Sequence, residues 1–289
     1  MLKVFNKLFI GGDWNVCIQK KEECFLIRAE KGFWYADPFL FKRDNKTYIF
    51  VEAFEKKKEL GRIGFLSSDD NFSKLSILIS NQFHYSFPNV FSYKDNFYMI
   101  PESSEEQGVF LYKFESFPFS LVRVSRLLSG DYVDTSLIKK EEKFYIFSSY
   151  DNYLKKIVFF KYAFIDDLVE IINDYDDVDN SFRPAGNAFV EDDKIVAPFQ
   201  YCKNKYGEKI VLKNIDFVDK KVVIKDVVGE INEFSFDFIK KHGRIHTYNS
   251  CDDSFVIDYM NEKFSLLKSF HMLKRKMRRK SHAKKGKKQ

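Results

Sequence analysis

The sequence predicts an all-β protein, a five-bladed β-propeller with a basic C-terminal tail that is helical or disordered. Three observations support this prediction: the composition, an internal repeat, and the space between the copies of that repeat. The chain has 289 residues, is 45% hydrophobic and 18% aromatic, and contains only 12 Gly and 6 Pro. It can therefore bury a large core, which excludes global disorder and a collagen-like chain.

The repeat is clearest in residues 37–52, DPFLFKRDNKTYIFVE, and residues 87–102, FPNVFSYKDNFYMIPE. Residues 134–149 form a third copy, a looser one follows, and residues 245–260 fit as a fifth if their turn is shorter. Each copy has an apolar strand, a polar turn and a second apolar strand, which is typical of a hairpin. The anchor positions, near which the blades start, are Pro38, Pro88, Thr135, Gly186 and Thr247.

Between copies there is room for two more strands, such as residues 63–67 and 75–79 after the first copy, and 108–112 and 121–124 after the second. Four strands per unit, repeated about every fifty residues, predict propeller blades, with an irregular β-sandwich as the alternative. We expect residues from Trp14 onward to close the ring by adding a strand to the last blade. The expected organisation is one propeller over residues 1–263 and a tail over residues 264–289.

The net charge of +6 is unevenly distributed. Ten of the 48 Lys and Arg lie between Lys274 and Gln289, a stretch without Asp or Glu, so residues 1–273 carry 38 basic against 42 acidic side chains. An acidic body does not suit a nucleic-acid-binding surface, so we expect no specific nucleic-acid partner.

The four cysteines, Cys17, Cys24, Cys202 and Cys251, show neither C-x-x-C spacing nor the density of a disulfide scaffold. We expect them to be reduced and packed as small apolar groups in a cytoplasmic protein. The apolar N-terminal stretch is too short for a secretory signal, and no window is apolar enough to span a membrane.

In a propeller the first strand of each blade lines the central channel, so polar residues at the repeat starts converge. Asp and Glu are depleted in strands, so their recurrence at one place in the repeat indicates a pocket. The alternative for each of these side chains is that it satisfies a turn or pairs with a neighbour. The catalytic candidates are Asp37, Asp134 and Glu102; the substrate-binding candidates are Glu52, His84, Tyr85, Arg183, Gln200, Tyr206, His246 and Asp258.

The sequence contains no P-loop, nucleophile elbow, dinucleotide fingerprint or zinc-ligand cluster. We therefore expect no cofactor, although a divalent metal is not excluded by the sequence. Carboxylates beside flat rings indicate carbohydrate chemistry, because the rings stack on sugar faces and paired carboxyl groups catalyse reactions of the glycosidic bond. The candidate rings are Trp34, Tyr35, Tyr85 and Tyr201.

Several short motifs occur in an order that carries a family resemblance: YADPF at 35–39, HYSFPNVF at 84–91, MIPES at 99–103, RPAG at 183–186 and IHTYN at 245–249. Over roughly residues 10–260 the chain resembles the propeller domain named after the N-terminal part of glucosamine inositolphosphorylceramide transferases. Bacterial relatives resemble polysaccharide-biosynthesis proteins, and we expect this chain to be one of them. The fold of that domain is similar to the glycoside hydrolases of families 43 and 32.

The resemblance to family 43 implies that Asp37 is a general base. It also implies that Asp134 corresponds to the aspartate that adjusts the pKa of the general acid. Where that family has the glutamate that acts as general acid, this sequence has Arg183. A fixed cation suits a phosphate leaving group, which departs as an anion and needs electrostatic stabilisation. We therefore predict sugar transfer from a phosphate-activated donor to a glycan or lipid-linked acceptor. In this hypothesis Arg183 and His246 hold the donor phosphate, while Glu102 and Asp134 position sugar hydroxyls.

Two alternatives stay open. A hydrolase of the family 43 or 32 type would use Glu102 or Glu52 as its acid, and a non-catalytic propeller would bind carbohydrate without turnover.

The tail has apolar residues at helical spacing over residues 264–280, at positions 266, 267, 270, 273 and 277. A basic amphipathic helix predicts attachment to an anionic membrane surface, on the inner face of the membrane for a cytoplasmic enzyme. Non-specific RNA binding and simple solubilisation are the alternatives.

Overall fold

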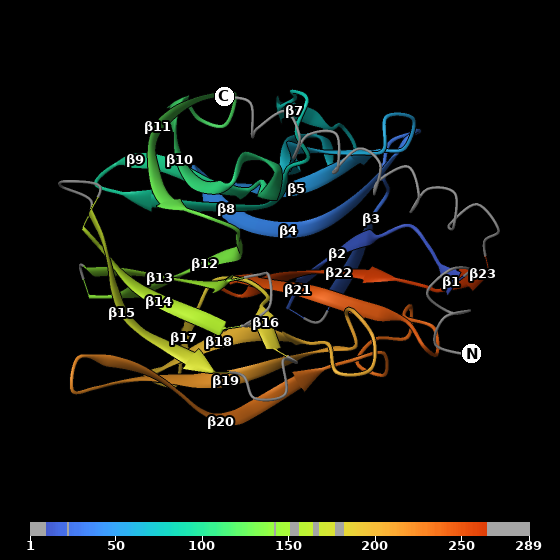
Figure 1. The fold of residues 1–289 in the computed structure, drawn as a ribbon. Helices are drawn as coiled ribbons and strands as arrows, with labels where there is room; N and C mark the ends of the chain where they lie inside the picture. The colour runs from blue at the N-terminus through green and yellow to red at the C-terminus, as the bar shows by residue number, and fades with distance from the viewer. Residues whose placement is uncertain are drawn as a thin grey trace.

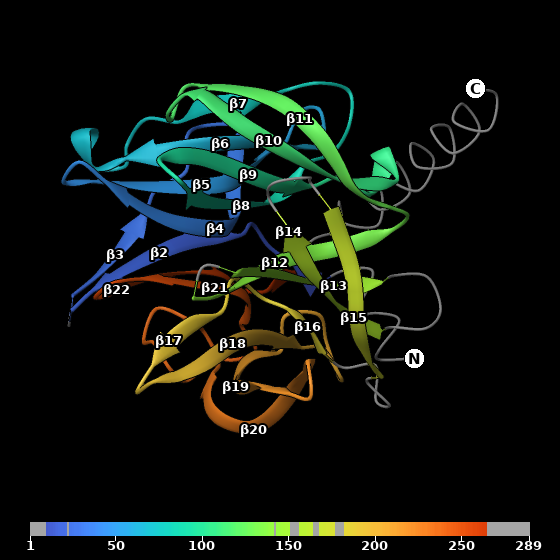
Figure 2. The same ribbon diagram turned by 90° about the vertical axis from the view of Figure 1, so that its left-hand side faces the viewer.

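The computed structural model describes residues 10–21, 23–141, 143–150, 156–163, 168–176 and 182–264. It confirms the predicted all-β, five-bladed propeller. Five antiparallel sheets form a ring, and in all but the last the strands are consecutive in the chain. Figures 1 and 2 show the sheets of residues 33–129 at the top and the sheet of residues 182–231 at the bottom of both views. The predicted tail lies outside the described residues, apart from its first residue, Phe264.

The blades are numbered in chain order by their first strands. Blade 1 comprises β4 (Phe33–Arg43), β5 (Lys46–Glu55), β6 (Leu60–Ser67) and β7 (Ser76–Ile79). Blade 2 comprises β8 (Ser86–Tyr93), β9 (Asn96–Glu102), β10 (Gly108–Ser116) and β11 (Ser120–Ser129). Blade 3 comprises β12 (Tyr132–Lys140), β13 (Lys143–Tyr150), β14 (Lys156–Ala163) and β15 (Leu168–Asp176).

Blade 4 comprises β16 (Phe182–Pro184), β17 (Phe189–Glu191), β18 (Lys194–Tyr201), β19 (Lys209–Val218) and β20 (Lys221–Ile231). Blade 5 comprises β21 (Arg244–Cys251), β22 (Ser254–Met260), β2 (Asn15–Lys20) and β3 (Glu23–Ile27). Outside the blades, β1 (Ile10–Gly11) pairs with β23 (Lys263–Phe264), and two 3₁₀ turns cover Ser68–Asp70 and Ser104–Glu106.

The predicted polar turns connect the first two strands of the blades. Two consecutive residues with positive φ form the turn at Asp44–Asn45, Lys94–Asp95 and Asp192–Asp193. This is the backbone of a type I′ turn, whose twist matches that of the flanking strands and which favours Asn, Asp and Gly. The short polar segments of the repeat therefore fix the register of these three hairpins.

The core is divided among the interfaces between blades. Neighbouring residues of β5 illustrate the pattern: Ile49 belongs to the cluster shared with blade 5, and Phe50 to the cluster shared with blade 2. Three further clusters join blades 2 and 3, 3 and 4, and 4 and 5. Because strands alternate their side chains between two faces, each central strand contributes to two of these clusters.

The ring closes through the N-terminal segment, as predicted. β2 pairs with β22 along residues Asn15–Lys20, and β3 then forms the outer strand, so two early strands complete blade 5 rather than one. The last blade is therefore built from both ends of the propeller, which ties the ring shut without a covalent link between blades.

Three asparagine side chains cross-link all five blades. Asn89 of blade 2 donates to the carbonyl of Thr135 (2.9 Å), and Asn249 of blade 5 donates to the carbonyl of Pro38 (2.9 Å). Asn187 of blade 4 donates to Asn89 (2.8 Å) and accepts from the Leu137 amide (2.8 Å). The amide of Asn187 in turn donates to the Asn249 side chain (2.9 Å). These bonds satisfy backbone groups that strand pairing leaves free.

The first strand of blade 4 is interrupted, which explains why its copy of the repeat is the loosest. β16 ends at Pro184, and β17 resumes at Phe189 on the same partner strand, β18. Gly186 in the gap has φ +152°, and a Cβ there would lie 2.0 Å from the carbonyl oxygen of Tyr248 in blade 5. Only glycine permits this approach of two backbones.

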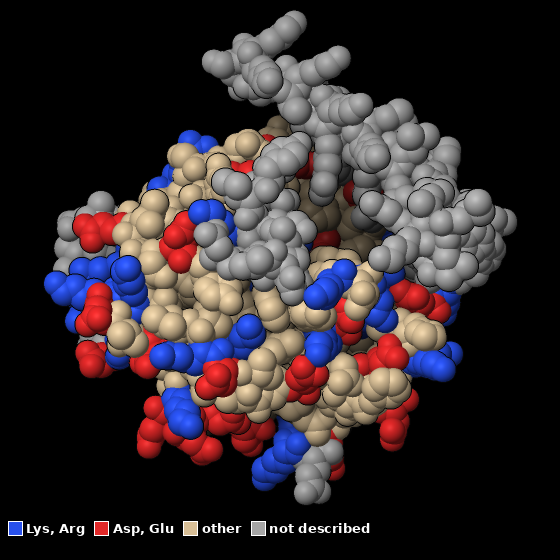
Figure 3. Space-filling model, turned by 60° about the horizontal axis from the view of Figure 1, so that its bottom comes forward, with Lys and Arg blue, Asp and Glu red and all other residues tan. Residues whose placement is uncertain are grey.

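Figure 3 shows one face of the molecule, which is hollowed near its centre, with acidic side chains visible inside the hollow. Among the described residues, none belongs to a helix with the length and apolar character needed to cross a membrane.

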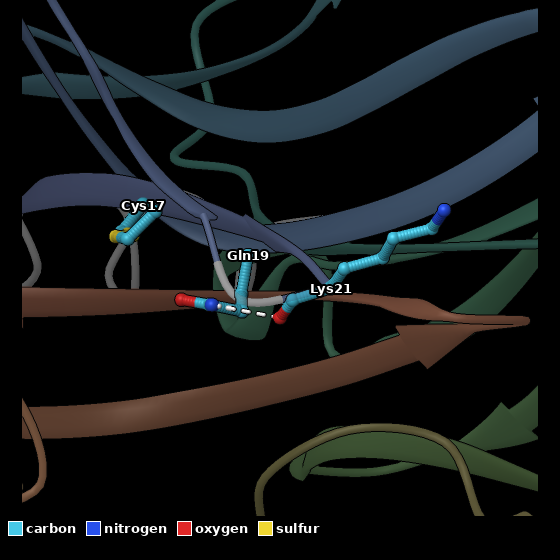
Figure 4. Close-up of a disulfide and its surroundings, with 4 residues drawn as sticks. Cys17, Gln19 and Lys21 are labelled. Carbon is cyan, nitrogen blue, oxygen red and sulfur yellow. Dashed lines mark hydrogen bonds between the residues drawn. A yellow bond between two sulfur atoms is a disulfide. The ribbon is translucent and has the colours of Figure 1, made fainter.

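The β2–β3 hairpin contains a disulfide between Cys17 and Cys24, drawn in Figure 4, whose Cα atoms lie 6.6 Å apart. The expectation of four reduced cysteines is therefore wrong for this pair, while Cys202 and Cys251 are free. Cys17 lies opposite Leu26 and Cys24 lies opposite Gln19, so the two cysteines are diagonal neighbours on one face of the hairpin. Their wide spacing in the sequence concealed this proximity.

We predict that Gly186→Ala destabilises the propeller strongly, by about 3 kcal/mol or more, because the new methyl group collides with a fixed backbone carbonyl. Gly32→Ala is the matched control, since Gly32 also has positive φ (+94°) but no atom lies within 4 Å of its Cβ position. We expect that control to cost about 1 kcal/mol from backbone strain alone. Urea unfolding compares the two variants, and equal losses would contradict the proposed close approach.

Candidate active site

The predicted site residues converge because the first strands of four blades carry a β-bulge at the same place. The register shifts lie between Ala36 and Phe39, Ser86 and Asn89, Val133 and Ser136, and Ile245 and Tyr248. Within these bulges Asp37, Phe87 and Asp134 have positive φ, of 48°, 48° and 55°. A bulge leaves an amide out of the strand ladder and turns the neighbouring side chain, here toward the centre of the ring.

The amides released by the bulges are bound by carboxylates of the preceding blade. Asp258 of blade 5 accepts from the Asp37 amide of blade 1 (2.9 Å). Asp37 accepts from the Phe87 amide of blade 2 (3.2 Å), and Glu102 of blade 2 accepts from the Asp134 amide of blade 3 (2.7 Å). The acidic side chains therefore have a structural role in addition to any chemistry.

Asp258 is a supporting residue rather than a substrate contact. It is fully buried and accepts four hydrogen bonds: from the amides of Asp37, His246 and Thr247, and from Nδ1 of His246 at 2.6 Å. An ionised carboxylate offers about four acceptor sites, so none is left for a ligand. This corrects the expectation that Asp258 binds substrate.

His246 lies between two carboxylates and beneath an aromatic ring. Its Nδ1 faces Asp258, its Nε2 lies 3.6 Å from Asp37 Oδ1, and Trp14 stacks on its ring at 3.9 Å. Burial lowers its pKa, but the charge and hydrogen bond of Asp258 and the charge of Asp37 overcome this and raise the pKa to about 9. The imidazolium is 4% exposed. It therefore supports Asp37 and is not open to the donor phosphate, which the sequence had suggested it would hold.

Asp37 is the carboxylate best placed to act as a base. Burial raises its pKa to about 7, against the opposing charge of His246, with further increases from Glu52, Asp258 and Asp134. It accepts one bond from the Phe87 amide and one from the Thr247 hydroxyl (2.8 Å), which leaves acceptor capacity. A base with a pKa near neutrality is poised for proton transfer.

Glu102 is held in its protonated form over much of the neutral range. Burial and the charge of Asp134 raise its pKa to about 8, although Arg183 and the amide of Asp134 act in the opposite direction. It accepts a single hydrogen bond in the described part of the protein. Glu102 can therefore donate a proton or a hydrogen bond to an oxygen in the channel.

Arg183 is the cation of the site. Its Nε donates to Asp134 Oδ2 at 2.6 Å, and its guanidinium lies 5.8 Å from the ring centre of Tyr206. No described residue accepts a hydrogen bond from its two terminal nitrogens, and its side chain is 33% exposed. Asp134, Tyr206 and Glu102 raise its pKa well above the ordinary value despite burial, so the charge is permanent. Four N–H groups are thus presented in a fixed fork.

Tyr206 joins this group from the loop after β18. Its ring meets His246 edge-on at 5.2 Å and is 42% exposed. Gly207, with φ +66°, packs against Trp14 and accepts from the Ile245 amide, which holds the loop against blade 5. Gln200, on β18, is only 1% exposed, and its Nε2 approaches the Pro184 carbonyl at 3.5 Å, so its side chain is buried in blade 4.

His84 and Glu52 form a second group between blades 1 and 2. His84 Nε2 lies 3.2 Å from Glu52 Oε1, and His84 Nδ1 accepts from the Gly61 amide (3.0 Å). Tyr85, in contrast, is 1% exposed, and its hydroxyl is bound to Asn81 and Glu106. Its ring belongs to the core and offers no face to a sugar, which corrects the expected substrate contact.

The other proposed stacking rings differ in the same way. Tyr35 is 1% exposed, while Trp34 is half-buried and stacks on Phe54 at 4.3 Å. Tyr201 is also half-buried, against Phe182.

Trp14 and Thr247 are site residues that sequence reasoning missed. Trp14 was assigned only to ring closure, and Thr247 only to the repeat anchor, yet one covers His246 and the other binds Asp37. The conjunction of IHTYN with an early Trp gave no signal, because their contact depends on blade 5 being assembled from both ends of the propeller.

Asp37, His246 and Asp258 place ligand atoms within 4.8 Å of one another, the spacing of a metal site. The donor set does not fit a cation, because Asp258 already accepts four hydrogen bonds and His246 Nδ1 is bound to it. The trio is better described as a histidine that two acids orient and charge.

Comparison with known proteins identifies relatives of this chain. Residues 27–244 match the family described as glucosamine inositolphosphorylceramide transferase 1, N-terminal. The glucosamine inositolphosphorylceramide transferase 1 of Oryza sativa subsp. indica is 24% identical over 198 residues, which cover 64% of this chain and 27% of the rice protein. The Arabidopsis thaliana protein of that name is 32% identical over 117 residues, covering 39% and 15%. The chain thus matches about a quarter or less of each plant relative.

Solved structures of glycoside hydrolases share the fold. Bacteroides ovatus Xyloglucan PUL GH43B superposes with a TM-score of 0.55 at 14% identity, over 80% of this chain and 54% of that one. The family 117 hydrolase Zg3597 of Zobellia galactanivorans gives 0.53 at 10% identity, over 88% and 91%. The exo-beta-1,3-galactanase of Phanerochaete chrysosporium gives 0.53 at 8%, over 68% and 49%. At these identities the likeness establishes the fold alone.

We predict that Glu102→Gln removes a pH dependence of stability. Since folding raises the pKa of Glu102 from 4.5 to about 8, the native protein loses stability as the pH rises through that window, and the uncharged variant does not. Relative to the native protein, the free energy of unfolding of the variant should therefore rise by about 4 kcal/mol between about pH 4.5 and about pH 8.5. Urea unfolding across this range measures it, with the exposed Glu23→Gln as control. Parallel curves for native protein and Glu102→Gln would refute the assignment.

Proposed function

Since the chain belongs to the family of the glucosamine inositolphosphorylceramide transferase 1 N-terminal domain, we propose that it transfers a sugar from a phosphate-activated donor to a hydroxyl acceptor. The acceptor is a glycan or a lipid-linked molecule, and the reaction belongs to the synthesis of a cell-surface polysaccharide or glycoconjugate. The observation that carries this proposal is the Arg183 fork: a fixed cation with unused donors among carboxylates. A guanidinium fork matches the geometry of phosphate oxygens, so the diphosphate of an activated donor suits it.

In the proposed reaction Asp37 takes the proton of the acceptor hydroxyl, and the acceptor oxygen forms a bond to the anomeric carbon of the donor. The bond from that carbon to the phosphate oxygen breaks, and the leaving phosphate departs with the electron pair. Arg183 stabilises its negative charge, so no proton needs to be delivered to it.

The remaining site residues position the reactants. Asp134 holds Arg183 Nε at 2.6 Å, which directs the terminal nitrogens away from itself. Glu102 and Asp134 also offer oxygens to sugar hydroxyls. His246 keeps a positive charge 3.6 Å from Asp37, which favours the ionised form that accepts the proton.

A second candidate, hydrolysis, is favoured by one observation: Glu102 has a pKa of about 8. A protonated glutamic acid beside an ionisable Asp37 is the pairing that glycoside hydrolysis requires. In that reaction Glu102 protonates the leaving oxygen and Asp37 activates water, and Arg183 has no direct role. A propeller that only binds carbohydrate is the third alternative.

We expect a nucleoside diphosphate to raise the melting temperature of the native protein, because a ligand that binds only the folded state stabilises it. Arg183→Ala should abolish that shift and Arg183→Lys should weaken it, since a lysine has no fork. Arg28→Ala, at an exposed position, is the control. Sugar release to water that survives Arg183→Ala would favour the hydrolase instead.

Asp37→Asn separates catalysis from binding. We expect it to lower transfer by about 10²–10⁴-fold with the donor-dependent thermal shift retained, because a general base contributes that much to rate. A binding-only propeller would form no product with any donor, whether native or variant.

We also propose that the basic tail, residues 264–289, holds the enzyme peripherally at an anionic membrane. The eleven Lys and Arg of this tail attract anionic lipid by about 1 kcal/mol each near the surface. Deleting residues 264–289 should abolish co-sedimentation with phosphatidylserine vesicles, and high salt should weaken the sedimentation of the full chain. Unchanged sedimentation after the deletion would contradict the proposal.

A further inference from the structure

Glu52 is a buried carboxylate whose hydrogen bonding the fold does not complete. Its side chain, on β5, is only 7% exposed, and within the described structure Oε1 is buried and receives no hydrogen bond. His84 Nε2 lies 3.2 Å away, close enough for an ion pair but not aligned as a hydrogen-bond donor. Buried carboxylates are costly without such partners, so Glu52 is retained at the expense of stability.

His84 complements Glu52 at the edge of the channel. Its Nδ1 accepts from the Gly61 amide, so a proton on Nε2 remains available to a ligand. The His84 amide is bound by Glu105 Oε2 at 2.9 Å, and the side chain is 31% exposed. The pair therefore offers a hydrogen-bond acceptor from inside the channel and a donor from its rim.

The fold makes room for this pair. A Cβ on Gly61 would lie 2.7 Å from Glu52 Oε1 and 2.8 Å from His84 Cε1, so the glycine permits both side chains to occupy the site. Beside them the half-buried Trp34 ring stacks on Phe54, whose ring centre is 6.2 Å from that of His84. An aromatic surface and two hydroxyl partners thus lie together at blades 1 and 2.

This group is separate from the Arg183 fork. Blade 4, which carries Arg183, adjoins neither blade 1 nor blade 2 in the ring. Asp37 belongs to blade 1, and the charge of Glu52 acts on it. The proposed base therefore has a cationic group on one side and a hydroxyl-binding pair on the other.

We propose that Glu52 and His84 form the acceptor subsite, where they bind two neighbouring hydroxyls of a sugar or cyclic polyol. A vicinal diol donates hydrogen bonds to the carboxylate and accepts one from Nε2–H, which supplies the partners that Glu52 lacks. The inference rests on the proposed transfer reaction and adds where the acceptor binds and which of its chemical features is recognised.

The test uses Glu52→Gln in the full chain, with myo-inositol as a probe rich in vicinal hydroxyls and 1,4-cyclohexanediol as a probe without them. We expect saturation-transfer NMR to show myo-inositol bound to the native protein and about tenfold or more weaker in the variant, because a charged hydrogen-bond acceptor is lost. Glu55→Gln, on the same strand and paired with Lys58, is the matched control and should bind as the native protein does.

Thermal unfolding without ligand distinguishes binding from a structural role. Glu52→Gln should keep or raise the melting temperature, because it removes a buried charge that the fold leaves unsatisfied. A lowered melting temperature of Glu52→Gln would overturn the inference. So would native protein that binds both probes equally, or a variant that binds myo-inositol as well as the native protein does.

Donor binding is measured separately, so the two proposals can fail independently. A nucleoside diphosphate should stabilise native protein and Glu52→Gln alike. If it stabilises neither, the transfer reaction is refuted, whereas the diol comparison still decides whether Glu52 and His84 bind hydroxyls.

Discussion

The structure depends on one recurring constraint: the bulge in the first strand of the blades releases backbone amides that a carboxylate must bind. Asp258, Asp37 and Glu102 each accept such an amide from the next blade. An unpaired buried amide would be costly, so the acids at the centre hold the blades in register. The same bulges turn Asp37 and Asp134 toward the centre. Site and ring closure are therefore one feature, which explains why acidic residues recur there.

The acids differ in how many hydrogen bonds they accept from the protein, and this difference indicates which role suits each of them. Asp258 is saturated with four bonds, Asp37 accepts two, Glu102 accepts one, and Glu52 Oε1 accepts none within the described structure. Capacity left over is what a substrate can use. The saturated acid therefore supports, the intermediate ones are suited to proton transfer, and the unsatisfied one is suited to binding. Removing Asp258 would disturb two blades, whereas removing Glu52 would break none of these hydrogen bonds between carboxylates and amides.

Sequence reasoning recovered the fold because the repeat encodes it locally: alternating apolar residues and polar two-residue turns specify each hairpin. It singled out Asp37, Asp134 and Glu52 as candidates because acidic residues are depleted in strands, and Arg183 because a guanidinium can bind an anion. It could not assign their hydrogen bonds, since these join residues such as Asp37 and Asp258 that are distant in the sequence. Tyr85 illustrates the limit: beside His84 in the chain, it points into the core while its neighbour faces the channel edge. The Cys17–Cys24 bond and the asparagine cross-links were likewise invisible, because they depend on register.

The central claim is that the channel binds an activated donor through its phosphate at Arg183. The most direct measurement is a crystal structure of the protein with a bound nucleoside diphosphate. We predict phosphate oxygens within hydrogen-bond distance of the terminal nitrogens of Arg183, with Asp134 still bound to Nε. Phosphate located elsewhere, such as the hollow on blades 1 and 5 lined by Lys20, Lys21 and Lys42, with Arg183 left without a ligand, would contradict it.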